Sequence, residues 1–197
     1  MKLKPIFILA MVVILAVVGT LLFMQKSNDS GAQSGKIGGD FTLSSAQGPV
    51  TLSDYDNQVK LLFFGYAHCP DVCPLTMANI KVALKQLTEN ERQQVQTLFV
   101  SVDPERDTLA HLEQYVNFFD PSFVGLTGSK AEIDRVVRQY GAFYRLDKAS
   151  EEDENYTVSH SARLYVIGKD NEIEQYLYHD SSSEEIAEAL KTLLQTQ

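Results

Sequence analysis

The chain has 197 residues, of which 44% are hydrophobic and 22% charged, so we expect one ordinary folded domain rather than a disordered chain, a collagen-like fibre or a coiled coil. Two cysteines are too few for a disulfide scaffold, and too few for a four-cysteine zinc or iron–sulfur site. The net charge of −9 argues against nucleic acid as a partner, because that partner needs a basic face.

The N-terminus carries an uncharged run from Pro5 to Met24, preceded by Lys2 and Lys4. At about 1.5 Å per residue, this run is long enough to cross a hydrocarbon layer of roughly 30 Å as a helix. The lysines favour a cytoplasmic N-terminus, which places the folded domain on the periplasmic side of the inner (cytoplasmic) membrane. A cleaved signal peptide is the alternative, although its apolar core is usually shorter. The predicted parts are a cytoplasmic N-terminus, a transmembrane anchor, a flexible tether and a folded domain, at residues 1–4, 5–24, 25–36 and 37–197.

Strands and helices alternate along the predicted domain. Apolar runs bounded by turn residues predict strands at 41–43, 50–52, 59–66, 95–102, 124–126, 163–167 and 173–178. Capping residues and apolar stripes predict helices that begin at Pro74, Thr108, Ser129 and Ser182. An acidic loop is expected at 147–155. This order predicts an α/β fold with a central mixed sheet flanked by helices.

The two cysteines, Cys69 and Cys73, lie between the predicted strand 59–66 and the helix that begins at Pro74. A buried strand that leads into Cys-x-x-x-Cys at a helix start is a thioredoxin-like arrangement. It exposes the pair at one end of the sheet, where backbone N–H groups and the helix dipole favour thiolate over thiol. A structural disulfide would stabilise little, because only three residues separate the cysteines. Inert buried thiols are disfavoured by the two prolines and the aspartate around them.

Three kinds of chemistry remain open for the pair: dithiol–disulfide exchange, metal binding, or both. Two thiolates are soft ligands that suit Cu(I) and Zn(II), and a third ligand would be a histidine. We expect His68 to point away from the adjacent thiol, and His111 and His179 to lie at the surface. His160 follows a long loop and directly precedes a strand, so it is the histidine best placed to reach the cysteines.

Four blocks of the sequence, in order, resemble the Sco/SenC family of copper proteins. They lie at 63–74, which holds both cysteines, and at 99–108, 125–128 and 158–162. The resemblance implies a thioredoxin-like fold with an inserted hairpin, and an N-terminal membrane anchor. It also implies that Cys69, Cys73 and His160 bind one copper ion. One residue and one segment depart from the family pattern. Ser159 replaces a frequent aspartate, and the segment 166–171 lacks the usual Asp-Pro-rich turn.

The function implied by the resemblance is that of a membrane-tethered copper metallochaperone. Its partners would be a copper donor and, as recipient, cytochrome c oxidase subunit II with its binuclear copper centre, or another copper-receiving protein. The alternative is an enzyme, a thiol–disulfide oxidoreductase in which the redox-active pair Cys69 and Cys73 reduces the cysteines of a partner. A peroxidase or stress sensor is a third hypothesis, since it needs only an exposed thiol of low pKa. A disulfide between the two cysteines would abolish the copper site.

Overall fold

The computed structural model describes residues 37–150 and 152–196. The anchor and tether that the sequence predicts, 5–24 and 25–36, lie outside these residues. Within the described ranges, no helix combines the length and the apolar character that crossing a membrane requires. From Ile37 onward the chain forms a single unit with its own hydrophobic core.

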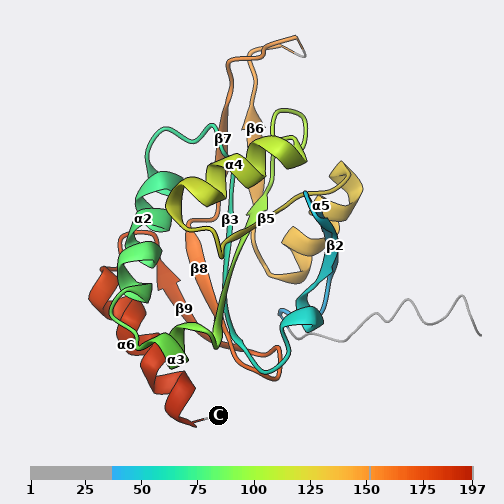
Figure 1. The fold of residues 1–197 in the computed structure, drawn as a ribbon. Helices are drawn as coiled ribbons and strands as arrows, with labels where there is room; N and C mark the ends of the chain where they lie inside the picture. The colour runs from blue at the N-terminus through green and yellow to red at the C-terminus, as the bar shows by residue number, and fades with distance from the viewer. Residues whose placement is uncertain (1–36, 151, 197) are drawn as a thin grey trace, which may run out of the picture. The chain divides into compact units, whose positions relative to one another are not determined.

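A five-stranded mixed sheet forms the centre of the domain, as Figure 1 shows. Its strand order is β5-β4-β3-β8-β9; β3 is parallel to β4 and antiparallel to β8. Every residue of β3 is buried, Lys60 included, which confirms that this largely apolar run forms a central strand covered on both faces. The strands of this sheet are β3 Val59–Gly65, β4 Val95–Ser101, β5 Val124–Leu126, β8 Arg163–Ile167 and β9 Ile173–Tyr178.

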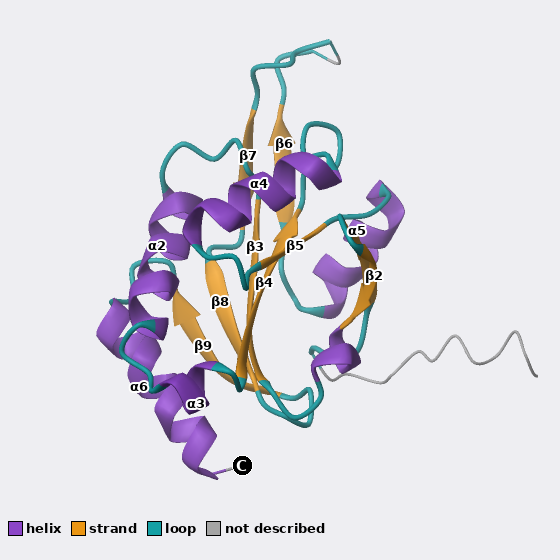
Figure 2. Ribbon diagram, viewed as in Figure 1, coloured by secondary structure: helices purple, strands orange, loops and turns teal. Residues whose placement is uncertain are grey.

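Helices cover both faces of the sheet (Figure 2). On one face, Tyr115 of α4 packs on Phe99 of β4 with ring centroids 5.2 Å apart, and α2 lies beside both α4 and α6. On the other face, Tyr140 at the end of α5 lies 5.8 Å from Phe64 of β3. The helical segments are η1 Leu52–Tyr55, α2 Val72–Leu84, α3 Glu89–Arg92, α4 Leu109–Phe119, α5 Lys130–Gln139 and α6 Ser183–Thr196.

The helix starts follow the capping residues, with one correction. The hydroxyls of Thr108, Ser129 and Ser182 each accept the N–H of the residue three positions further on. The helix expected to begin at Pro74 instead begins at Val72. Proline is tolerated throughout a first turn, because the N–H that it lacks has no partner within the helix. Cys73 therefore lies inside the first turn of α2.

Two hairpins lie outside the central sheet. The first pairs β1 Thr42–Ser45 with β2 Gly48–Thr51, as predicted. The second pairs β6 Tyr144–Asp147 with β7 Thr157–His160 and projects from the domain in Figure 1. The residue pattern predicted only a loop here, because both strands are short and contain few apolar residues, although the family resemblance implied an inserted hairpin without placing it. The acidic segment is the tip of this hairpin, and His160 ends β7 rather than preceding a strand from within a loop.

Candidate metal centre

The structure brings Cys69, Cys73 and His160 together beyond the C-terminal end of β3. One potential ligand atom from each residue lies within 4.8 Å of the other two. Cys73 Sγ is 3.5 Å from His160 Nε2, and the Cys73 N–H donates to Cys69 Sγ over 3.5 Å. Cys73 is buried, whereas Cys69 and His160 are partly exposed. Two sulfurs and one imidazole nitrogen thus form a compact donor set that solvent reaches at two of its three members.

The pKa values of the two thiols are shifted in opposite directions. A hydrogen bond from the Cys73 thiol, helped by backbone N–H groups, lowers the pKa of Cys69 to about 3, although burial opposes this shift. The same interaction with the Cys69 thiolate, together with burial, raises the pKa of Cys73 well above its ordinary value. In the metal-free site, Cys69 is therefore the thiolate and Cys73 the thiol that donates to it.

The ring of His160 is oriented before any metal binds. Its Nδ1 lies 3.1 Å from the carbonyl oxygen of Ser161. A carbonyl only accepts hydrogen bonds, so when the ring is neutral Nδ1 carries its proton and the lone pair of Nε2 faces the cysteines. The rings of Phe63 and Tyr66 stand edge-on to the imidazole, with centroids 6.0 and 5.8 Å away. These contacts hold Nε2 in a position suited to a metal ligand.

Gly65, the last residue of β3, makes room for the buried thiol. A Cβ placed on Gly65 would lie 2.6 Å from Cys73 Sγ and 2.9 Å from a ring carbon of Phe99. Close packing leaves no space for that atom, so any side chain here would displace the thiol. This role of Gly65 was not predicted from the sequence. The one sequence signal that points to it is a glycine inside a largely apolar strand.

Ser159 precedes His160 but does not contact its ring. The Ser159 hydroxyl donates to Asp147 across the hairpin over 2.6 Å, and successive side chains of a strand point to opposite faces. The imidazole takes its orientation from the carbonyl of Ser161 instead. The departure from the family pattern at Ser159 therefore leaves the geometry of His160 intact.

Asp103 and Arg106, in the loop after β4, hold the hairpin through Tyr156, about fifty residues further along the chain. Arg106 Nε and the Tyr156 hydroxyl each donate to the carboxylate of Asp103 over 2.6 Å. The guanidinium also lies 3.6 Å from the centroid of the Tyr156 ring, and Nη1 donates to the Tyr156 carbonyl over 2.8 Å. These charge-assisted contacts compensate the loss of hydration of the Asp103 carboxylate, which is fully buried. They fix the strand that carries His160, and the sequence analysis did not identify them.

The side chain of His111 is 39% exposed, but its ring has close neighbours that the sequence did not predict. Its ring is not simply solvated: it lies 4.9 Å from the ring of His68, and both imidazoles face the carboxylate of Asp107. His68, as expected from its position next to Cys69, directs its ring elsewhere, toward Asp107. His179 is half-buried and donates its backbone N–H to Ala162.

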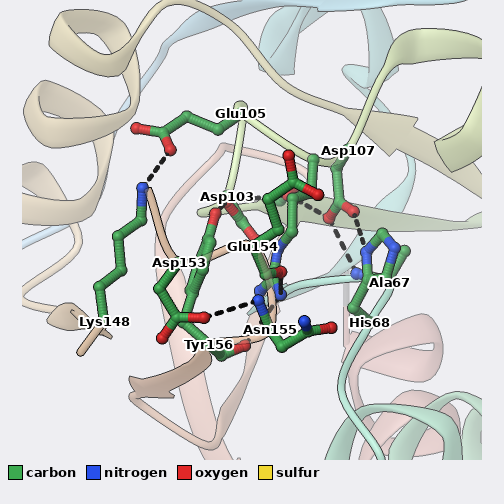
Figure 3. Close-up of polar contacts among 12 residues, drawn as sticks. Ala67, His68, Asp103, Glu105, Asp107, Lys148, Asp153, Glu154, Asn155 and Tyr156 are labelled. Atoms are coloured by element: carbon green, nitrogen blue, oxygen red, sulfur yellow. Dashed lines mark hydrogen bonds and ion pairs between the residues drawn. The ribbon is translucent and has the colours of Figure 1, made fainter. Parts of the chain in front are cut away.

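A cleft of 840 Å³ opens beside these residues. It lies between His68, the loop after β4 and the acidic tip of the β6–β7 hairpin. Figure 3 shows Lys148 of the hairpin paired with Glu105, and His68 beside Asp107. The acidic segment 152–155 lines this cleft.

Comparisons with known proteins agree with this arrangement. A family model described as SCO1/SenC matches residues 29–195. The mitochondrial SCO1 homolog of Mus musculus is 40% identical over 153 residues, which cover 77% of this chain and 54% of that protein. A SCO2-like protein of Rickettsia felis is 35% identical over 157 residues, which cover 79% of this chain and 76% of that protein. The chain thus matches about half the length of the mouse relative and most of the bacterial one.

Two solved structures share the fold closely. Arabidopsis thaliana ScoI with copper bound has a TM-score of 0.74 and 31% identity, over 82% of this chain and 99% of that one. Bradyrhizobium japonicum ScoI with copper bound has a TM-score of 0.71 and 36% identity, over 80% of this chain and 99% of that one. Nearly the whole of each solved chain therefore aligns with the folded domain described here. The family model and these relatives together show that the chain belongs to the SCO1/SenC family.

Proposed function

We propose that this protein is a copper metallochaperone that binds one copper ion through Cys69, Cys73 and His160. The observation that carries the proposal is the convergence of two sulfurs and one imidazole nitrogen within 4.8 Å. This soft donor set suits Cu(I), whereas a structural zinc site takes four protein ligands. The relatives from Arabidopsis thaliana and Bradyrhizobium japonicum, which share the fold, were solved with copper bound.

Loading of the site begins at the more exposed sulfur. Cys69 is already a thiolate, and Nε2 of His160 presents a lone pair. Cys73 must give up its proton to become the third ligand, because metal ligation requires a deprotonated thiol. Binding of Cu(I) therefore releases one proton near neutral pH, and oxidation of the two thiols to a disulfide removes the site.

Release of copper proceeds by ligand exchange at the exposed side. Cys69 and His160 are accessible, whereas Cys73 is buried beneath them. A thiolate or imidazole of the recipient replaces the exposed ligands first, and the Cys73 sulfur leaves last. We propose cytochrome c oxidase subunit II, or another copper-receiving protein, as the recipient, and a separate copper donor upstream. Membership of the SCO1/SenC family supports this assignment.

The N-terminal segment completes the proposal. Residues 5–24 anchor the chain in the inner membrane, and 25–36 tether the domain on the periplasmic side; the uncharged run and its preceding lysines support this topology. Protease treatment of spheroplasts should digest the domain, and N-terminal sequencing of the membrane-bound protein should begin at Met1. A chain that begins after residue 24 would instead show a cleaved signal peptide.

The test of copper binding uses the domain 37–197, reduced and free of oxygen, with Cu(I) titrated against a competing chelator. We expect one tightly bound ion, and in His160→Ala a weakening of at least about tenfold with disulfide formation intact. His179→Ala, a histidine outside the site, should bind like the wild type. Equal affinity in wild type and His160→Ala would remove His160 from the site, and no binding would overturn the proposal.

A thiol–disulfide reductase is the second candidate, and one observation favours it: an accessible thiolate next to a buried thiol. The Cys69 thiolate would attack a partner disulfide, form a mixed disulfide and release one partner thiolate. Cys73 would then lose its proton and attack the Cys69 sulfur, which releases the second partner thiol. The partner gains two electrons, and the pair is oxidised to a disulfide.

The reductase hypothesis has a direct assay. The reduced domain should cleave a model disulfide stoichiometrically, and Cys73→Ser should accumulate the mixed disulfide at Cys69. Bound Cu(I) should block both reactions, because it occupies the attacking sulfur. Failure to reduce the model disulfide would leave copper binding as the sole chemistry of the pair.

A further inference from the structure

We infer that His68, Asp107 and His111 form a second metal site, which takes a divalent transition-metal ion of the Cu²⁺ or Zn²⁺ type. One potential ligand atom from each of the three residues lies within 4.8 Å of the other two. None of these residues belongs to the Cys69, Cys73 and His160 set. The inference therefore goes beyond the proposed copper(I) chemistry and does not depend on it.

The interatomic distances fit a metal polyhedron. His68 Nδ1 is 3.2 Å and His111 Nδ1 is 3.7 Å from the same oxygen, Asp107 Oδ1. In a tetrahedral zinc site with bonds of about 2.0–2.1 Å, neighbouring ligand atoms lie roughly 3.3 Å apart. A small rotation of the His111 ring closes the remaining gap. In the metal-free form, both Nδ1 atoms face the same carboxylate oxygen, so a cation has room to bind among the three atoms.

Asp107 is held as metal-binding carboxylates are held. Its side chain is fully buried, and its second oxygen, Oδ2, accepts the Ala67 N–H over 2.8 Å and the Ser101 hydroxyl over 2.6 Å. Figure 3 shows the carboxylate joined by dashed lines to the Ala67 nitrogen and to the ring of His68. These two donors fix the carboxylate plane and leave Oδ1 toward the imidazoles. Hydrogen bonds of this kind orient the carboxylate ligands of known metal sites.

The two imidazoles approach Asp107 from different elements. His111 lies in the first turn of α4, where its N–H donates to the capping hydroxyl of Thr108 over 3.2 Å. His68 lies in the loop that follows β3. Their side chains keep exposures of 39% and 44%, so an ion bound between them retains open positions for water or an incoming ligand.

The donor chemistry selects the ion. Two imidazole nitrogens and one carboxylate oxygen suit Zn²⁺ and Cu²⁺, whereas Cu(I) prefers sulfur. The 840 Å³ cleft that His68 lines carries more acidic than basic side chains, with Glu105 and 152–154 against Arg106 and Lys148. This excess of negative charge raises the local concentration of cations at the site.

The experiment isolates this site from the first one. The background is domain 37–197 with Cys69→Ser, Cys73→Ser and His160→Ala, which removes every ligand of the proposed copper(I) site. Zn²⁺ is titrated by calorimetry, and Cu²⁺ is followed by electron paramagnetic resonance. We expect one equivalent of either ion, and for Cu²⁺ the couplings of two imidazoles. Because the background lacks the first site, the result is independent of whether Cu(I) binds there.

Two further substitutions in that background decide the assignment. His111→Ala should weaken binding by about tenfold or more and remove one imidazole coupling. His179→Ala is the matched control and should change neither quantity. The inference is overturned if the background binds no stoichiometric ion, or if His111→Ala and His179→Ala behave alike. Should circular dichroism show the background to be unfolded, the wild-type domain with its cysteines oxidised to the disulfide gives the same readouts.

Discussion

Raising the pH from 7 to 8 should strengthen Cu(I) binding to the domain about tenfold, which corresponds to one proton released per ion. The structure determines this number. The lowered pKa of Cys69, about 3, means that this sulfur has no proton to lose at neutral pH. The raised pKa of Cys73 means that the second sulfur still holds its proton. The free protein therefore carries one more proton than the loaded one, and affinity increases with pH.

Two thiols that titrate independently would give a clearly different pH dependence of the Cu(I) affinity. At the unperturbed pKa of about 8.5, two such thiols would together release about 1.9 protons at pH 7. Their Cu(I) affinity would then rise roughly sixtyfold between pH 7 and 8, rather than about tenfold. In free energy, the coupled pair gains about 1.4 kcal/mol over this unit of pH, and the independent pair nearly twice as much.

The assay is a chelator competition at pH 7.0, 7.5 and 8.0 under anaerobic reducing conditions, with the pH dependence of the chelator measured separately. Calorimetry in two buffers of different ionisation enthalpy counts the released protons directly. Cys73→Ser is the control: it removes the thiol that must ionise, so its weaker binding should be nearly independent of pH. A proton release close to two in the wild type would refute the hydrogen-bonded thiol–thiolate pair.

Three other predictions concern the residues that position the site. Gly65→Ala should cost about 1–3 kcal/mol of stability and weaken Cu(I) binding, because its Cβ meets Cys73 Sγ at 2.6 Å; unchanged melting and affinity would contradict this packing. Arg106→Ala should destabilise the domain by about 3–5 kcal/mol in urea unfolding, because it leaves a buried carboxylate without its cationic partner. Arg145→Ala removes an exposed ion pair and should lower the stability by at most about 1 kcal/mol. An equal loss of stability in Arg106→Ala and Arg145→Ala would contradict the role given to the contacts of Arg106. Iodoacetamide at pH 6 should alkylate Cys69 in preference to Cys73 by mass spectrometry, and equal labelling would contradict the thiolate assignment.

The sequence predicted those parts of the fold that depend on local patterns. The apolar run at 59–66 becomes the buried central strand, and the hydroxyls of Thr108 and Ser129 cap the helices expected to follow them. The residue pattern did not reveal the β6–β7 hairpin, and only the family resemblance implied an inserted hairpin, because contacts remote in sequence hold it. Arg106 and Tyr156, for example, are fifty residues apart and meet at one carboxylate. No periodicity within either segment signals that contact.

The residues of the candidate site likewise fall into those that a local sequence pattern reveals and those that depend on tertiary packing. The cysteine pair is visible in the sequence because both residues lie close together in the chain, one after a strand and the other in the first turn of the helix that follows. His160 stood out only by its place before a strand and by the family resemblance, since no local pattern brings it to the cysteines. The role of Gly65 and the meeting of His68 with His111 depend on which atoms fill a given space. Such packing follows from the folded sheet and not from spacing along the chain.

The parallel pairing of β3 and β4 explains why two donor sets arise next to each other. Gly65 lies opposite Ser101 at the ends of these strands, so the loops that follow them leave the sheet side by side. The β3 loop supplies His68 and Cys69 in succession, and because neighbouring side chains diverge, each joins a different set. The β4 loop supplies Asp107 to one of them. Potential sulfur ligands thus collect over the start of α2, and potential oxygen and nitrogen ligands over the start of α4, so one end of the sheet carries donor sets of the types that suit soft and borderline metal ions.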